Sequence, residues 1–390
     1  MTQELLEIQG QPSFTLATDS VQAAISRFGA MLAPVTFFAD SDAPIQPYAI
    51  APWALESVDR RTPRLLAALR GDFMCSAFGD NAQRHAGRVV PPHGDTANDE
   101  WEFVYSRMLR SGSALRLQID MPTQGGMCIG TTTLLRGHQF VYQRHDFPGF
   151  SGEINPGHHA LLQCSPASGP ARISFSRSIL VGSSPPRAAL AEANDFSRLR
   201  PGSFGADVTA MPGKDGSMID ASSFPSHSAT DDVLIVCADP QNEFSWSAAV
   251  FPEAGYAWLS LRNTADLPST LVWQSNGGLA AAPWNSRHVG VLGLEDVMGY
   301  FSVGLAESAT ENELTRRGVA TSRKVMPGEV LRMPYIQGVV RIPPHVDRIV
   351  AVRRESAETL VLVAPNGSEV SAACRWEFLC DGLIPQLCED

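Results

Sequence analysis

Apolar and polar residues alternate along much of the chain, and this pattern predicts β-strands. Ala114 to Asp120 alternates residue by residue, as expected of a strand with one buried face. Other apolar runs end at turn-forming residues, as in 232–237, 256–261 and 359–363. Because such runs recur at short intervals with Gly, Pro, Asn or Asp between them, we predict an all-β fold, a large antiparallel β-sandwich.

Helical patterns are few and short. The stretch 62–70 has a capping threonine, a proline at the first helical position and a glycine just beyond its end, which predicts one short helix. A second helix is expected over 187–199, before Pro201. The segment 202–228 is rich in Gly, Ser, Asp and Pro and is predicted to be a long loop, a kind of segment that often carries function.

Length and composition favour the same architecture. The chain has 390 residues, more than the roughly 250–300 that one hydrophobic core usually supports, so two lobes or one very large sandwich is expected. Only 18% of the residues are charged, whereas 32 are glycine and 28 are proline, which favours many strands joined by turns. We expect a single large sandwich over 1–390, with 1–55 and 320–390 contributing additional strands.

Charge, hydropathy and cysteine usage limit which binding partners and which cellular compartment are expected. The net charge of −11 and the absence of clustered Lys and Arg argue against nucleic-acid binding. No apolar run approaches the ~20 residues of a membrane span, and residues 1–14 lack the regions of a signal peptide. Seven scattered cysteines never form a Cys-x-x-Cys motif, so we expect free thiols, no structural zinc and a cytoplasmic protein. The cysteines are Cys75, Cys128, Cys164, Cys237, Cys374, Cys380 and Cys388.

Four segments carry residues suited to chemistry. The first, 71–79, is followed by a Pro-Pro-His-Gly turn at 91–94 and by Trp101. The second is Asn-Pro-Gly-His-His at 155–159, the third is Trp-Gln-Ser-Asn-Gly-Gly at 273–278, and the fourth is the apolar run 290–297 with a Gly-Leu-Glu-Asp sequence inside it.

Taken together, in this order, the segments resemble the galactose mutarotase-like (aldose 1-epimerase) superfamily. The resemblance covers about residues 60–305 and matches the family's two histidines and its late glutamate to His93, His159 (or His158) and Glu295. The chain departs from the family pattern because Asp296, and not proline, follows the glutamate. The family's Asn-Arg pair before the first histidine has no clear match, although Asn81 with Arg84 or Arg88 is available to supply it.

The resemblance implies a sugar ligand, epimerase activity at the anomeric carbon, and no cofactor. Anomer exchange needs a base for the proton of the anomeric hydroxyl and an acid for the ring oxygen. We assign Glu295 as the base, His159 as the acid and His93 as the group that orients the sugar. The remaining expected substrate-binding residues comprise polar side chains near these groups and tryptophans that could stack on a sugar ring. They are His158, Arg88, Asn81, Trp101, Trp273 and Trp284.

Other interpretations remain open from sequence alone. Strand alternation sends His158 and His159 to opposite faces, so at least one of them is expected to be structural. Glu295 could simply face water, and each tryptophan could belong to the core. Two histidines and a carboxylate could also bind a metal, although no short His-x-His spacing supports this. A non-catalytic carbohydrate-binding or regulatory protein on the same fold is the alternative function, and the oligomeric state is open, with a homodimer as one possibility.

Overall fold

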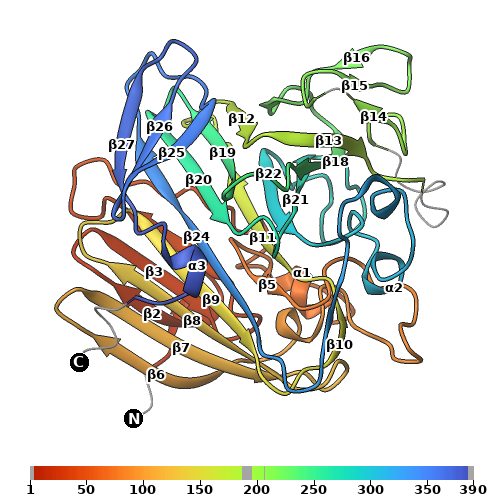
Figure 1. Cartoon of the computed structure of the whole chain (residues 1–390), viewed down its shortest axis with the longest axis horizontal. Helices are drawn as coiled ribbons and strands as arrows, with labels where there is room; N and C mark the ends of the chain where they lie inside the picture. Colours follow the sequence, from red (N-terminus) through yellow and green to blue (C-terminus); the bar gives the residue numbers. More distant parts are fainter. Residues whose placement is uncertain (1–3, 187–195, 206, 385–390) are drawn as a thin grey trace.

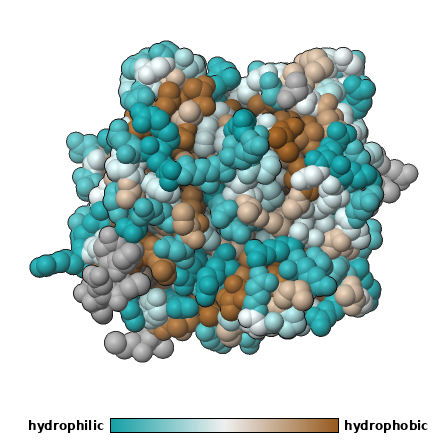
Figure 2. All heavy atoms as spheres, in the orientation of Figure 1, coloured by the Kyte–Doolittle hydropathy of each residue, from teal (hydrophilic) through white to brown (hydrophobic). Residues whose placement is uncertain are grey.

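β-strands dominate the structure (Figure 1), and the prediction of an all-β fold is confirmed. The computed structural model describes residues 4–186, 196–205 and 207–384. The same view in Figure 2 shows polar residues over most of this face, with apolar residues gathered in several separate areas. None of the helices in the described residues is long and apolar enough to cross a membrane.

The larger of two main sheets has nine strands, and every neighbouring pair in it is antiparallel. In spatial order the strands are β17 (Ser223–Phe224), β12 (Ala171–Phe175), β19 (Ser245–Phe251), β20 (Tyr256–Arg262), β24 (Leu331–Arg341), β9 (Phe140–Phe147), β8 (Met127–Leu135), β7 (Gly112–Asp120) and β6 (Glu102–Met108).

The second main sheet has seven strands and carries the candidate site. Its strands are again antiparallel to their neighbours. In spatial order they are β14 (Phe204–Gly205), β13 (Ser178–Ser183), β18 (Thr230–Ala238), β21 (Ser269–Asn276), β22 (Val291–Val297), β11 (Gly157–Gln163) and β5 (Met74–Cys75).

Smaller sheets complete the structure at its edges and ends. One four-stranded sheet contains β1 (Leu6–Ile8), β2 (Gln11–Ala17), β3 (Val21–Ser26) and β4 (Leu32–Phe37). A three-stranded sheet contains β25 (Ala351–Ser356), β26 (Thr359–Val363) and β27 (Glu369–Ala373). Two-stranded ribbons pair β10 (Gly152–Ile154) with β23 (Arg323–Val325), and β15 (Met211–Pro212) with β16 (Met218–Ile219).

Helices in the described chain are short: α1 (Arg64–Ala68), α2 (Leu305–Ser308) and α3 (Phe378–Asp381), with 3-10 turns η1 (Asp95–Ala97) and η2 (Thr315–Arg317). The helix predicted over 62–70 is present in shortened form as α1. Most of the helix predicted over 187–199 lies outside the described residues, and its described part, 196–199, is not helical. The loop predicted over 202–228 contains the two-residue strands β14 to β17.

Three layers of apolar side chains hold the sheets. One lies between the two main sheets and includes Leu117 of β7, Trp258 of β20 and Leu294 of β22. A second covers the other face of the seven-stranded sheet, where loops and α1 pack on it. A third lies between the nine-stranded sheet and β25–β27 with α3. The cysteines of the described residues are free thiols, and Cys388 lies outside those residues.

Candidate functional site

Two adjacent strands of the seven-stranded sheet bring a histidine and a glutamate face to face. β11 and β22 are antiparallel, and their register places His159 opposite Glu295 and His158 opposite Asp296. Because side chains alternate along a strand, the first pair points to the outer face of the sheet and the second to the interior between the sheets. On the outer face, Nε2 of His159 lies 3.7 Å from Oε2 of Glu295.

A loop carries His93 to the same place. The turn at 91–94 is closed by a hydrogen bond from the amide of Gly94 to the carbonyl of Pro91 (2.9 Å). His93 itself has a positive φ of 61°, a conformation that costs a non-glycine residue free energy and is often found at functional sites. Its ring centroid lies 4.9 Å from that of His159. The three residues assigned to catalysis from the sequence therefore lie together.

A glycine makes room for the glutamate. Gly293 precedes Glu295 by two positions on β22, so both face the outer side of the sheet. A Cβ atom at Gly293 would lie 2.5 Å from Oε1 of Glu295 and 3.0 Å from Cβ of Trp273. Both distances are shorter than a normal non-bonded contact, so the Gly-x-Glu sequence lets the carboxylate pack against β21.

Aromatic rings enclose the histidines on one side. Phe73 stacks on His159 with ring centroids 4.7 Å apart and an interplanar angle of 15°. Phe78 meets His93 edge-on at 5.2 Å. Beneath His93, the Sγ atom of Cys75 lies 3.4 Å from Nδ1 of its ring. Only 5% of His159 and 2% of Glu295 is exposed, so these neighbours leave little of the pair open to water.

A cluster of tryptophans extends the site on the other side. Trp273 meets His159 edge-on with centroids 6.3 Å apart, and Trp284 in turn meets Trp273 at 5.8 Å. His288 stacks on Trp273 at 5.2 Å. The indole Nε1–H of Trp273 donates a hydrogen bond to Asp231 (3.0 Å), which fixes the plane of the ring. Trp273 and Trp284 are half-buried, so together with half-buried His93 they connect the cluster with the surface.

Burial sets the protonation of the group. It raises the pKa of Glu295 well above its usual value, because a carboxylate loses hydration in an apolar environment. Burial also lowers the pKa of His159 well below the usual value, and the neighbouring His93 lowers it further. Burial lowers the pKa of His93 to about 4, against an opposing effect of Asp80. Burial therefore favours the neutral form of each of these three side chains.

His158 does not reach this site, which corrects its assignment as a substrate-binding residue. Its side chain is fully buried between the sheets, where Nδ1 lies 2.9 Å from Oδ2 of Asp72. Its ring stacks on Tyr335 with centroids 3.8 Å apart. Strand alternation is the reason, because the neighbour of an outward-facing residue on β11 must point inward.

Trp101 and Asn81 are also placed in structural roles. Trp101 is 1% exposed, packs in the layer between the sheets and donates its indole hydrogen to the carbonyl of Thr96 (2.9 Å). It therefore offers no surface to a sugar. The amide of Asn81 donates to the carbonyls of Ala77 (2.7 Å) and Pro91 (2.9 Å), and its oxygen accepts from the amide of Leu305 (2.8 Å). These bonds occupy Asn81 and brace the loop that carries His93.

Arg88 lies on the surface and hydrogen-bonds the carbonyl of Gln124 (3.0 Å). Within the described residues, no contact connects Arg88 with His159 or Glu295. The geometry also does not favour a metal centre, since no group of three or more His, Cys, Asp or Glu side chains in the described chain is arranged to hold an ion.

Sequence reasoning missed the aromatic residues that enclose the histidines. Phe73 and Phe78 lie inside the segment 71–79, which stood out only for its position before the His-Gly turn. Trp53, whose ring centroid lies 5.1 Å from that of Trp284, comes from a distant loop with no motif around it. His288 stands in none of the four segments, and its stacking on Trp273 brings it into the cluster.

No protein-family model matches the sequence, and no curated protein matches it. Solved structures do match. A galactose mutarotase-like protein from Clostridium acetobutylicum superimposes with a TM-score of 0.57 at 9% identity, over 87% of this chain and 98% of that chain. A candidate aldose 1-epimerase from Escherichia coli K12 gives 0.55 at 15% identity, over 85% and 99%. A candidate mutarotase from Salmonella typhimurium gives 0.55 at 9% identity, over 86% and 93%.

This chain has the galactose mutarotase-like fold. At these identities the likeness concerns the fold, and it confirms the fold that the resemblance implies. In this mutarotase-like fold, the cluster around His159 and Glu295 occupies the outer face of the seven-stranded sheet, under the loops that contain α1 and η1. Chemistry beyond the fold has to be argued from that cluster.

Proposed function

We propose that the chain binds a carbohydrate at the His93–His159–Glu295 cluster and interconverts the anomers of an aldose. The observation that carries this proposal is the cross-strand placement of His159 against Glu295, with 3.7 Å between Nε2 and Oε2 and with His93 beside them. The fold is shared with candidate aldose 1-epimerases from Escherichia coli K12 and Klebsiella pneumoniae, which supports a carbohydrate as the ligand.

The proposed reaction needs two proton transfers around one carbon atom. Glu295 takes the proton of the anomeric hydroxyl while His159 delivers a proton to the ring oxygen. The bond between the anomeric carbon and the ring oxygen breaks, and a carbonyl group forms at the anomeric carbon. Rotation of the open chain and the reverse transfers then close the ring with the other configuration. His93, whose ring lies 4.9 Å from that of His159, orients the sugar.

One proton shared by the pair satisfies this scheme. Burial raises the pKa of Glu295 and lowers that of His159, so in the free protein it favours the proton on the carboxyl group over the imidazole. Ring opening needs the same proton on the imidazole of His159, with Glu295 ionised. This state of the pair has the same net charge as the state in which the carboxyl group holds the proton. We expect activity to fall at acidic pH, where both groups are protonated, and at alkaline pH, where both have lost the proton.

The tryptophans give the sugar an apolar surface. Trp273 and Trp284 are half-buried and meet near His159, and indole rings suit the apolar faces of pyranoses. Because Asp231 holds the indole of Trp273 by a hydrogen bond, that ring is positioned before a ligand arrives.

The burial of the pair also favours a second candidate, a carbohydrate-binding protein without catalytic activity. Only 2% of Glu295 and 5% of His159 is exposed, so contact of either group with a sugar requires surrounding side chains to shift. A ligand that stays on the surface of Trp273 and Trp284 would bind without meeting the carboxyl group.

Anomer exchange measured across a panel of aldoses and aldose phosphates decides between these functions. Polarimetry and NMR exchange spectroscopy report the rate, and calorimetry reports binding. For an epimerase, Glu295→Gln should lower the rate by about 10²–10⁴-fold, because the substitution keeps the shape and removes the base. Glu355→Gln, the same change at an exposed position on β25, should keep the full rate.

Binding of a sugar without faster anomer exchange would assign the non-catalytic function. Activity that survives in Glu295→Gln would show that Glu295 is not the base. If no sugar of the panel is bound or interconverted, the carbohydrate proposal itself is wrong.

A further inference from the structure

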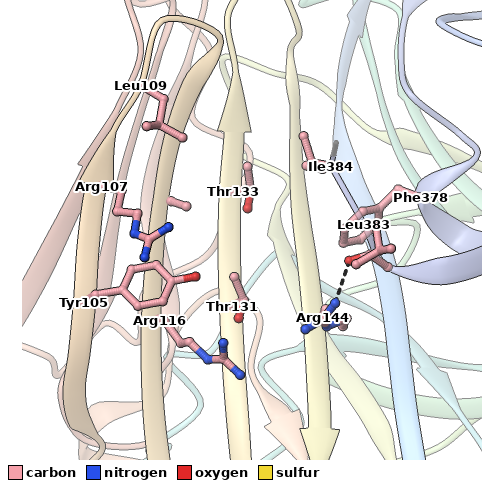
Figure 3. A pocket seen from close by; sticks show the side chains of 12 residues that line it. Tyr105, Arg107, Leu109, Arg116, Thr131, Thr133, Arg144, Phe378, Leu383 and Ile384 are labelled. Atoms are coloured by element: carbon pink, nitrogen blue, oxygen red, sulfur yellow. Dashed lines mark hydrogen bonds between the residues drawn. The ribbon is translucent and has the colours of Figure 1, made fainter. Parts of the chain in front are cut away.

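A cavity of about 370 Å³ lies on the outer face of the nine-stranded sheet (Figure 3). Its floor is formed by β6 to β9. Along β7, Leu115 and Leu117 point into the layer between the sheets, so Ala114 and Arg116 point outward into the cavity. Both main sheets therefore separate this cavity from Glu295.

The C-terminal segment provides one wall of the cavity. Phe378 of α3 and the residues that follow it, from Gly382 to Ile384, stand beside β9. Arg144 of β9 donates a hydrogen bond to the carbonyl of Gly382 (3.0 Å), which is the dashed line in Figure 3. This bond holds the wall against the sheet and gives the cavity an apolar side.

The lining is positively charged. Three arginines and no acidic residue are among the 12 residues that line the cavity, although the chain as a whole carries a net charge of −11. Arg144 is neutralised, because a guanidinium nitrogen lies 2.9 Å from Oδ2 of Asp146. Arg107 and Arg116 form no ion pair with any residue that the structure describes.

Tyr105 lies beside both guanidinium groups that have no ion pair in the described part of the chain. The guanidinium carbon of Arg107 lies 4.7 Å from the centroid of the Tyr105 ring, and that of Arg116 lies 6.0 Å from it. Figure 3 shows Arg107, Tyr105 and Arg116 together on one side and Thr131 and Thr133 on the neighbouring strand. Cation–π contacts of this kind orient a guanidinium group without neutralising its charge.

Hydroxyl groups line the floor between the arginines. Oγ1 of Thr131 is buried and has no hydrogen-bond partner in the described structure. An unsatisfied buried hydroxyl costs free energy unless a ligand or water completes it. Thr133 lies two residues further along the same face of β8.

We propose that this cavity binds a small phosphate monoester. Two guanidinium groups without an ion pair among the described residues and a buried hydroxyl match a dianion with three terminal oxygens, and arginine binds such oxygens with paired N–H donors. The apolar wall, with Phe378 and Leu383, then contacts the organic part of the ester. The volume is at the lower end of small-molecule pockets, which span roughly 300–1,000 Å³. The site assigned here is separate from the sugar cluster and does not depend on its function.

Calorimetric titration with phenyl phosphate, glycerol 3-phosphate, inorganic phosphate and phenol tests the assignment. The wild type should bind the two esters saturably and more tightly than inorganic phosphate, which cannot use the apolar wall. Arg107→Gln and Arg116→Gln should each weaken ester binding by about tenfold or more, since each removes a charged hydrogen-bonding group. Thr131→Val, which removes only the hydroxyl, should weaken it less.

Arg110→Gln is the matched control, because it removes one exposed positive charge at the turn between β6 and β7, outside the cavity. It should bind the esters as the wild type does, and so should Glu295→Gln. An equal loss of ester affinity in Arg110→Gln would mean that the effect comes from the overall charge of the protein, and it would overturn the proposed site. Equal affinity for inorganic phosphate and the esters would overturn the assignment of the apolar wall. Absence of ester binding to the wild type at millimolar concentration would reject the proposal.

Discussion

The two faces of the β11–β22 pair carry the same kinds of residues in very different surroundings. On the inner face, Asp296 lies 2.8 Å from a guanidinium nitrogen of Arg262 and accepts hydrogen bonds from Ser260 (2.6 Å) and Thr270 (2.7 Å). On the outer face, Glu295 forms no hydrogen bond within the described residues and lies 3.7 Å from His159.

This difference separates a compensated carboxylate, Asp296, from an uncompensated carboxyl group, Glu295. A buried carboxylate with a counter-charge and several donors is fully compensated, and it contributes to the stability of one packing arrangement. A buried carboxyl group without such partners costs free energy, and proteins retain such groups mainly where a reaction or a ligand uses them. The comparison predicts opposite effects on stability for the same substitution at adjacent positions.

The largest effect is expected for Asp296→Asn. The amide keeps the shape but leaves Arg262, which is 1% exposed, without its counter-charge. Removing one partner of a buried ion pair typically costs about 3–5 kcal/mol in the free energy of unfolding. Urea denaturation followed by tryptophan fluorescence measures this loss. Glu295→Gln, the equivalent change one residue earlier, serves as the comparison, and an equal loss in both variants would contradict the distinction between the faces.

His158 and His159 should show the same kind of difference, with the larger loss of stability on the inner face, but the difference should be smaller. His158→Gln removes the contact of Nδ1 with Asp72 (2.9 Å) between two fully buried side chains and should cost about 1–3 kcal/mol. Nδ1 of His159 has no partner in the described structure, so His159→Gln should cost less. Thermal denaturation ranks the two variants. Under the proposed function their order reverses for anomer exchange, where His159→Gln should have the larger effect.

The strand pattern was enough to predict the fold class, and alternation alone placed His158 and His159 on opposite faces. It could not choose between them, because the choice depends on which face of β11 meets the second sheet. Two-residue strands such as β17 (Ser223–Phe224) escaped prediction because they are too short to show a period. Trp101 and Asn81 were misassigned for a different reason. Their neighbours in sequence belong to the motif, but their side chains are used by backbone groups of the loop.

The phosphate-binding cavity could not have been predicted from sequence at all. Its arginines lie on β6, β7 and β9, but its apolar wall comes from residues 378–384, which follow them by more than 230 positions. Only the folded sheet and α3 bring these segments together. The proposed catalytic cluster could be predicted because each of its three residues stood in a motif, and their order along the chain resembles that of a known family.

The smallest expected effect is a gain in stability for Glu295→Gln, and its pH dependence identifies the cause. Burial raises the pKa of Glu295 above its usual 4.5 in the folded chain. Between that value and the folded pKa, the unfolded chain has lost a proton that the folded chain retains, so wild-type stability falls as pH rises. Glutamine does not titrate, and each unit of pKa elevation is equivalent to about 1.4 kcal/mol.

Melting temperatures from pH 4 to pH 9 should therefore coincide at the acidic end and diverge in favour of the variant above it. Glu355→Gln, the same change at an exposed position, should show no such divergence. A wild type that is more stable than Glu295→Gln at pH 8 would mean that the carboxylate is compensated after all, and the two faces would then not differ.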